Sequence, residues 1–172
     1  SDYLGLSRFV LTDFEPEAAQ RIELMYWVER YALETRIDAT RVIETYDTRR
    51  KLYREYTAAD RFVPSDDESI IQAARSAAGG ETNPYLQARS VYLFVLTQMT
   101  YDGKSPGKSI LDAFIAARGD SRDYSLLYCA MLRSLGIPAR PVAGVLVYDT
   151  RRTRTHHWAE FYLEGYGWIP VD

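Results

Sequence analysis

The feature that most constrains this chain is an apolar run at residues 125–135 with clear helix start and stop signals on either side. Leucine or methionine recurs at every fourth position from 127 to 135, which is typical of the buried face of a helix. Asp120 is a suitable N-cap, and Gly136, with a proline two residues later, suits the helix end. The sequence therefore predicts a central helix that begins at Ser121, followed by a strand over residues 137–147.

Ser121 would lie in the first turn of that helix, where two roles are open to a serine. Free backbone N–H groups and the positive end of the helix dipole stabilise an anion there, which suits a nucleophile. The simpler interpretation is that Ser121 only helps to cap the helix, as serines at such positions commonly do. The helix alone does not decide between them.

Four sequence blocks in a fixed order favour the first role. They are GDSRDY at 119–124, LRSLGIPAR at 132–140, HHWAE at 156–160 and GYGWIPVD at 165–172. Together they resemble the transglutaminase-like superfamily of papain-type fold, particularly its bacterial members. The resemblance covers residues 66–172 and implies that Ser121, His156 and Asp172 occupy the positions of the family's catalytic Cys, His and Asp. This chain departs from the family pattern at the nucleophile, where Ser121 replaces Cys.

The resemblance implies an α+β fold, with helices packed on an antiparallel sheet in a transglutaminase-like core. We expect this core at residues 63–172, truncated near its C-terminus. Residues 1–62 are predicted to be an N-terminal appendage of strands and an irregular connector, with tyrosines of residues 46–56 docking on the core. Alternating apolar residues at 22–37 favour two strands or one bulged strand, although a helix over the same residues stays open. The chain begins without Met and resembles an excised segment of a longer protein.

Three further helices are predicted within the core, at residues 65–78, 84–100 and 109–118. The second carries one apolar stripe formed by Ala88, Val91, Val95 and Met99. Residues 99–101 match a Met-x-Tyr motif that in the family precedes the nucleophile.

Strand periodicity decides whether Asp172 can reach His156. Residues 156–163 alternate, so His156, Trp158 and Glu160 share one face, whereas His157 points to the other. A connecting turn with an odd number of residues places Asp172 opposite Trp158 and diagonal to His156 on the same face. A turn with an even number would send the carboxylate to the opposite face. We predict the odd register.

Acid–base logic then assigns the roles that the resemblance implies. Asp172 would accept a hydrogen bond from one imidazole nitrogen, and His156 would act as general base and acid toward Ser121. The backbone N–H of Ser121 would hold the oxyanion, with Tyr101 or a nearby loop as candidate second donor. Trp158 and Glu160 are candidate cleft residues, and Arg140 is expected to anchor its strand through backbone carbonyls or a carboxylate such as that of Asp123.

Serine at the nucleophile position changes the expected activity. A thiol ionises near pH 8.5 and lower still beside an imidazole, whereas a hydroxyl needs concerted proton removal. Cys129 does not substitute, because eight residues along a helix correspond to about 12 Å. Three hypotheses stay open: an enzyme whose natural Cys was changed to Ser, a natural serine enzyme of weak activity, and a silent relative that binds peptides in the same cleft.

Composition limits the classes of ligand and partner that we expect for this chain. A net charge of −3 gives no reason to expect nucleic acid. Two adjacent histidines on a strand and a single cysteine make a zinc site improbable, and we expect no cofactor. No apolar stretch has the ~20 residues needed to span a bilayer, so we expect no membrane insertion by this segment. The resemblance implies a protein or peptide substrate. Because bacterial relatives are often exported or membrane-tethered, it also implies an extracytoplasmic or membrane-tethered location for the full-length protein.

Overall fold

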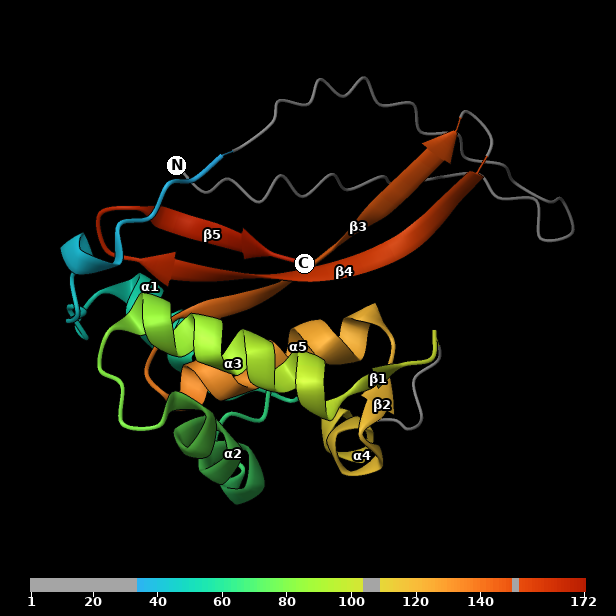
Figure 1. Ribbon diagram of the computed structural model, residues 1–172, viewed down its shortest axis with the longest axis horizontal. Coiled ribbons are helices and arrows are strands. Elements are labelled where there is room, and N and C mark those ends of the chain that lie inside the picture. The colour runs from blue at the N-terminus through green and yellow to red at the C-terminus, as the bar shows by residue number, and fades with distance from the viewer. Residues whose placement is uncertain (1–33, 104–108, 150–151) are drawn as a thin grey trace, which may run out of the picture. The chain divides into compact units, whose positions relative to one another are not determined.

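A computed structural model describes residues 34–103, 109–149 and 152–172 of the chain (Figure 1). Within it, Thr35–Asp172 forms one compact unit. Residues 35–62, predicted to belong to the appendage, are thus part of the same unit as the core. The strand prediction at residues 22–37 falls mostly outside the described residues, and residues 34–38 have no regular secondary structure.

In the part of the chain that the structure describes, helices come first, short strands separate the last of them, and a three-stranded sheet follows. The helices are η1 (Ala39–Arg41), α1 (Lys51–Thr57), α2 (Glu68–Ala78), α3 (Pro84–Gln98), α4 (Ile110–Ala116) and α5 (Ser121–Ser134). The strands are β1 (Thr100–Tyr101), β2 (Arg118–Gly119), β3 (Ala139–Asp149), β4 (Arg152–Leu163) and β5 (Gly167–Val171). This mixed architecture of helices on an antiparallel sheet is the predicted fold class.

The central helix α5 confirms the first prediction closely. It begins at Ser121 after the N-cap Asp120, and Gly136 has the positive φ of 80° that favours glycine just beyond the helix end. Side chains from Ser125 to Arg133 are buried all round the helix, as expected of a helix with neighbours on several sides. It packs against β4 and β3 on one side and α2 and α3 on the other (Figure 1).

The other predicted core helices are present with shorter bounds. Helix α2 starts at Glu68 rather than at residue 65, because the Asp67 carboxylate accepts hydrogen bonds from the N–H groups of Ser69 and Ile70. Helix α3 starts at Pro84 behind the N-cap Asn83, and its predicted apolar stripe is buried. Helix α4 ends at Ala116 instead of residue 118, because Ala117 is a left-handed C-cap and Arg118 begins β2.

The main sheet has the strand order β3-β4-β5 and is antiparallel throughout. Its core face carries Ala159, Phe161, Leu163 and Ile169, all of them buried against the helices. Between β4 and β5 the register pairs Leu163 with Gly167 and Ala159 with Val171, so three residues form the turn. The next position in this register sets Asp172 opposite Trp158, as the odd-turn prediction requires.

The prediction of an irregular connector at residues 46–56 is wrong for its second half, where α1 forms. Helix α1 places Tyr53 and Tyr56 three residues apart on one face, and each finds an aromatic partner. Tyr53 lies 5.7 Å from the Tyr46 ring, and Tyr56 meets Trp168 edge-on at 4.9 Å. The Tyr46 hydroxyl donates to the Tyr162 carbonyl at 2.8 Å. Tyr46 therefore docks on β4 from the segment before α1, and Tyr56 docks on β5 from α1 itself.

A two-stranded parallel pair lies beside the start of α5. Thr100 pairs with Arg118 and Tyr101 with Gly119, and the Asp102 N–H donates to the Gly119 carbonyl at 3.2 Å. This pairing fixes the end of α3 to the residue that precedes the α5 N-cap. Tyr101 is thereby held next to the first turn of α5.

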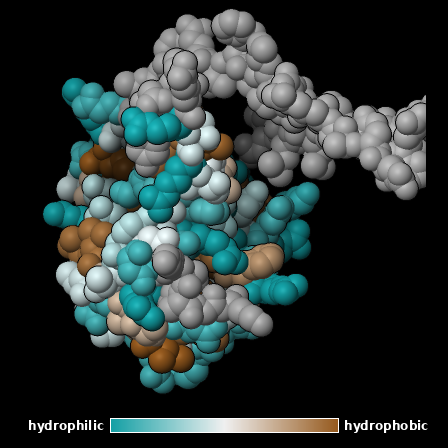
Figure 2. Space-filling model, turned by 90° about the vertical axis from the view of Figure 1, so that its right-hand side faces the viewer, coloured by the Kyte–Doolittle hydropathy of each residue, from teal (hydrophilic) through white to brown (hydrophobic). Residues whose placement is uncertain are grey.

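The surface on the side of α4 and the β1–β2 pair is largely hydrophilic, with separate small apolar patches (Figure 2). The most exposed large apolar side chain of the described residues, Ile115 of α4, is 84% exposed. Isolated residues of this kind are normal on a soluble surface.

Candidate active site

The first turn of α5 is fixed by a reciprocal capping box. The Asp120 carboxylate accepts hydrogen bonds from the N–H groups of Arg122 and Asp123, at 2.9 and 3.2 Å. In return, the Asp123 carboxylate accepts from the Asp120 N–H at 3.2 Å. Asp123 is only 1% exposed. The capping box therefore orders the backbone immediately around Ser121.

Gly119 is required by this arrangement for a steric reason. A Cβ atom placed at Gly119 would lie 2.5 Å from the Asp123 Oδ2 and 2.7 Å from its Cβ. Real Cβ atoms do not approach other atoms so closely, so any side chain would push Asp123 out of the capping box. The Gly-x-Ser-x-Asp spacing at residues 119–123 thus has a direct packing explanation.

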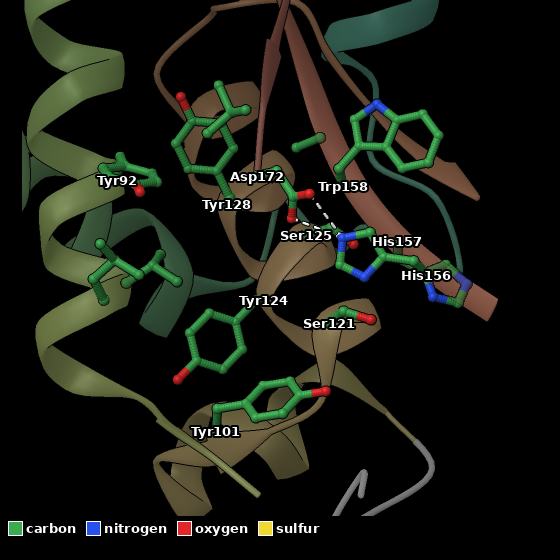
Figure 3. A pocket seen from close by; sticks show the side chains of 14 residues that line it. Tyr92, Tyr101, Ser121, Tyr124, Ser125, Tyr128, His156, His157, Trp158 and Asp172 are labelled. Carbon is green, nitrogen blue, oxygen red and sulfur yellow. Dashed lines mark hydrogen bonds and ion pairs between the residues drawn. The ribbon is translucent and has the colours of Figure 1, made fainter. Parts of the chain in front are cut away.

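His156 and Asp172 form a close pair at the end of the sheet. The His156 Nε2 lies 2.8 Å from both carboxylate oxygens of Asp172 (Figure 3). The His156 side chain is 20% exposed and the Asp172 side chain 66%. Because Nε2 faces the carboxylate, it carries the proton in that hydrogen bond, and Nδ1 is the nitrogen left for a reacting group.

The pair lies where the sheet narrows. Strand β5 ends at Val171, so the part of β4 before Ala159 pairs only with β3 among the described residues. A cavity of about 160 Å³ lies beside this stretch. It is lined by residues from both faces of the sheet end, including His156, Asp172 and Val171.

Ser121 lines the same cavity from α5 (Figure 3). The structure thus brings together all three residues that the resemblance places in a catalytic triad. Among the described residues, the imidazole of His156 has a hydrogen bond with Asp172, and none joins it to the Ser121 hydroxyl. Catalytic contacts of this kind commonly tighten only when substrate is bound.

Trp158, a predicted cleft residue, and Tyr101, the candidate oxyanion donor, also line the cavity. The Trp158 ring stacks beside His156, with ring centroids 6.4 Å apart and planes 24° apart. It lies over Gly144 of β3, where a Cβ atom would come within 2.6 Å of the indole ring. The Tyr101 hydroxyl accepts a hydrogen bond from Arg154 of β4 at 3.0 Å, so its own proton remains available to another acceptor.

Glu160 is not among the residues that line this cavity, although it was predicted to lie in the cleft. Its carboxylate pairs with Arg140, its direct cross-strand neighbour, at 2.8 Å. Arg140 also lies over the Trp168 ring, 4.1 Å from the centroid. The carboxylate that anchors Arg140 is therefore that of Glu160 rather than that of Asp123, because Asp123 serves the capping box.

Cys129 is fully buried on α5 and far into the helix. Burial raises the pKa of its thiol to about 12, so the reactive thiolate does not form at neutral pH. This agrees with the core-packing role predicted for it.

Nine cavity-lining residues were not predicted as site residues: Tyr92, Val95, Leu96, Tyr124, Ser125, Tyr128, His157, Ala159 and Val171. Three of them follow Ser121 on α5 at i+3, i+4 and i+7, which is one face of a helix. This spacing from the expected nucleophile is the signal that would have found them. Tyr92 reaches the cavity from α3, which no local sequence pattern indicates.

Among the described residues, no group of three or more His, Cys, Asp or Glu side chains is placed to hold a metal ion. None of the described helices combines the length and apolar character needed to cross a membrane.

Comparison with known proteins identifies the family. The sequence profile of the transglutaminase-like superfamily matches residues 71–172. The chain belongs to the transglutaminase-like superfamily. An uncharacterised protein of Haemophilus influenzae is 27% identical to it, over 69% of this chain and 39% of that protein. The chain thus spans about two-fifths of this curated relative.

Two solved structures share the fold of this chain. A candidate cysteine protease from Cytophaga hutchinsonii is 24% identical and superposes with a TM-score of 0.67, covering 79% of this chain and 47% of that one. The periplasmic domain of TgpA from Pseudomonas aeruginosa is 20% identical, with a TM-score of 0.60 over 75% of this chain and 48% of that one. Similarity at this level establishes the papain-like core and leaves the reaction open.

Proposed function

We propose that this transglutaminase-like chain catalyses acyl transfer from protein or peptide amides. Its activity is low because Ser121, rather than a cysteine, occupies the nucleophile position. The proposal rests mainly on one observation: Ser121 at the start of α5 and the His156–Asp172 pair line one cavity. A nucleophile, a base and a group that orients the base are the three parts that such chemistry needs.

The reaction follows from these positions. The nucleophile at position 121 attacks the amide carbonyl while His156 Nδ1 accepts its proton, and a tetrahedral oxyanion forms. The protonated imidazole then donates this proton to the departing amine or ammonia as the C–N bond breaks, leaving an acyl-enzyme. Water or an acceptor amine attacks the acyl group in a second round of the same proton transfers. Asp172 keeps the proton on Nε2 throughout and so acts as a positioning residue.

The oxyanion would be held by two donors at the same end of the cavity. One is the backbone N–H of Ser121, which lies in the first helical turn and has no partner within the helix. The other is the Tyr101 hydroxyl, whose oxygen already accepts from Arg154 and whose proton can therefore turn to the substrate. An anion at this point is further stabilised by the helix dipole.

Oxygen at position 121 limits the rate. A hydroxyl is not ionised at rest, so its attack depends on concerted proton removal by His156. No hydrogen bond between the two side chains prepares that transfer in the structure. The same observation favours the second candidate function, a catalytically silent module that binds peptides in this cavity.

A Ser121→Cys variant tests the proposal directly. We expect its kcat/KM on peptide amides to exceed that of the unmodified chain by on the order of 100-fold or more, because a thiol at a helix N-terminus beside an imidazole ionises readily. Activity is measured in two ways: release of a fluorescent amine from peptide amides, and incorporation of a labelled amine into a glutamine-containing peptide. The second assay distinguishes amine from water as acceptor.

Two variants serve as controls. Ser121→Ala removes the hydroxyl, so any rate that the unmodified chain shows above this variant belongs to Ser121. His156→Ala in the Ser121→Cys background should abolish the gain. A Ser121→Cys protein that folds and binds peptides but cleaves or transfers none would exclude the enzymatic proposal and leave the silent binding module.

A further inference from the structure

The cavity beside the reacting residues is much more apolar than the proposed acyl transfer needs. Away from Ser121, His156 and Asp172, its walls are formed largely by Val95 and Leu96 of α3, by Trp158, and by tyrosine rings of α3 and α5. The chemistry itself requires only a nucleophile, a base and oxyanion donors. The apolar walls therefore call for their own explanation.

The tyrosines of this cavity contribute aromatic rings to its walls, and two of their hydroxyls have hydrogen-bond partners outside its lining. The Tyr128 hydroxyl donates to the Ala88 carbonyl at 3.3 Å, and the Tyr101 hydroxyl accepts from Arg154. Burial raises the pKa of Tyr124 above its usual value, with the nearby charge of Asp102 adding to the shift, so this side chain remains neutral. Tyr101 and Tyr124 meet at an edge-to-face angle of 61°, with centroids 6.2 Å apart. Such walls favour another ring, because aromatic pairs add to the free energy of area burial.

The volume of the cavity determines which apolar side chains can fill it. Its volume is about 160 Å³, and an apolar cavity of ~150 Å³ in another protein accommodates benzene. One six-membered ring therefore fits, whereas a methyl group would leave most of the space empty. Unfilled apolar space forfeits the dispersion contacts that would stabilise a bound side chain.

The position of the cavity connects it to the reacting atoms. Its α5 wall runs from Ser121 to Tyr128, seven residues or about 10 Å along the helix. A peptide whose carbonyl lies at Ser121 can thus place a neighbouring side chain along this wall. The structure assigns this cavity as a subsite for an aromatic side chain, Phe or Tyr, of a peptide substrate. This assignment rests on the proposed function for its link to catalysis, but the binding it describes does not need the reaction.

Two leucines of α3 provide a matched pair for the test. Leu96 lines the cavity and is 48% exposed, whereas Leu93 is 51% exposed and is not part of the lining. Both are the same residue type on the same helix and are half exposed, so neither substitution removes a core side chain. Leu96→Glu introduces a carboxylate at the cavity wall, and Leu93→Glu introduces the same charge elsewhere on the helix.

The binding experiment uses the unmodified Ser121 chain. The dissociation constants of acetyl-Gly-Phe-Gly-amide and acetyl-Gly-Ala-Gly-amide are measured by calorimetry. We expect the Phe peptide to bind on the order of 10- to 100-fold more tightly than the Ala peptide. Leu96→Glu should remove most of that preference, whereas Leu93→Glu should change it less than about twofold. Equal affinities for the two peptides, or equal effects of the two glutamates, would overturn the assignment.

The catalytic experiment separates this inference from the proposed function. In the Ser121→Cys variant, an aromatic residue is moved through each position on either side of the attacked amide, and kcat/KM is compared with that of alanine peptides. A preference of on the order of 10-fold or more at one position, lost in Leu96→Glu, supports the subsite. An active variant without such a preference overturns the subsite and leaves the proposed function intact. An inert variant whose parent still binds the Phe peptide selectively overturns the function and supports the subsite.

Discussion

The two halves of the candidate active site are held in place in different ways. The helix half, around Ser121, is fixed by contacts within five residues of the chain, from Gly119 to Asp123. The sheet half joins two residues sixteen positions apart, His156 and Asp172. The Asp123 carboxylate that fixes the first half is 1% exposed, whereas the Asp172 side chain that orients the second is 66% exposed.

This difference implies that substitutions in the two halves affect different properties of the protein. A buried capping network tolerates little change without a loss of stability, because its polar groups have no water to replace a lost partner. An exposed hydrogen bond contributes little to stability, since water competes for both groups. We therefore expect changes in the helix half to lower stability, and changes in the sheet half to lower the rate while the fold survives.

The largest expected effect is on the rate and tests the sheet half. In the Ser121→Cys background, His156→Ala should lower kcat/KM by about 10³-fold, within the range attributed to general acid–base catalysis. Asp172→Asn should lower kcat/KM less, by about 10-fold or somewhat more. The Trp158 ring still stacks beside the imidazole in this variant, and the carboxylate that is lost is largely solvated. Both proteins should keep the parent's melting temperature within a few degrees. Equal rate losses for the two variants would show that Asp172 does more than orient the ring.

Thiol labelling compares the reactivity of the first turn of α5 with that of its buried interior. Burial raises the pKa of the Cys129 thiol to about 12, so the native chain should resist iodoacetamide at pH 8 and react only when unfolded. The Ser121→Cys variant adds a thiol in the first helical turn, at the cavity. This thiol should react at least about 100-fold faster than that of Cys129. Intact-mass spectrometry follows the label, and peptide mapping locates it. Labelling of Cys129 in the folded chain would contradict the buried position of this residue.

Gly119→Ala tests the helix half. The added methyl group would lie within 2.7 Å of two Asp123 atoms, so the capping box must break or the backbone must move, which should cost about 1–3 kcal/mol of stability. Chemical denaturation measures the loss. In an Asp123→Gly background the colliding side chain is absent, and the same Gly119→Ala change should cost clearly less. Additive losses in the double variant would show that the collision does not account for the glycine.

The helix half could be predicted from the sequence because its determinants are local. The N-cap Asp120, the helix start at Ser121 and the terminating Gly136 are all signals within one short stretch. Arg140 was expected to be anchored by backbone carbonyls or by a carboxylate such as that of Asp123. The carboxylate is that of Glu160, its cross-strand neighbour, and Asp123 is instead the N3 member of the capping box.

The sheet half could be predicted only in part. Period-two alternation gives the face of the sheet on which His156 lies. Whether Asp172 lies on the same face depends on the register between β4 and β5, and that register differs between a turn of odd and a turn of even length. The three-residue turn at residues 164–166 settles it. Helix α1 was missed because its stability comes from tertiary contacts of Tyr53 and Tyr56 rather than from capping residues, and no N-cap hydrogen bond marks its start. Tyr92 reaches the cavity through the packing of α3 on α5, which no single segment encodes.

Gly144→Ala has the smallest expected effect and distinguishes most sharply between the two halves. The new Cβ would lie 2.6–2.7 Å from two outer carbons of the Trp158 indole, and an indole at the sheet surface has room to shift. Such a shift would disturb the stack on His156, whose planes lie 24° apart. In the Ser121→Cys background we expect kcat/KM to fall by about tenfold, with less than about 1 kcal/mol lost in stability. Gly119→Ala should instead lower stability more than Gly144→Ala does and lower kcat/KM less.

Trp158→Phe serves as the control for this last prediction, since phenylalanine lacks the outer carbons that Gly144→Ala would meet. In that background the alanine should have almost no further effect on the rate. If Gly144→Ala instead destabilises the chain as strongly as Gly119→Ala does, the sheet half is as tightly packed as the helix half. The exposure of Asp172 would then say little about how the imidazole is held, and the contrast between the two halves would have to be abandoned.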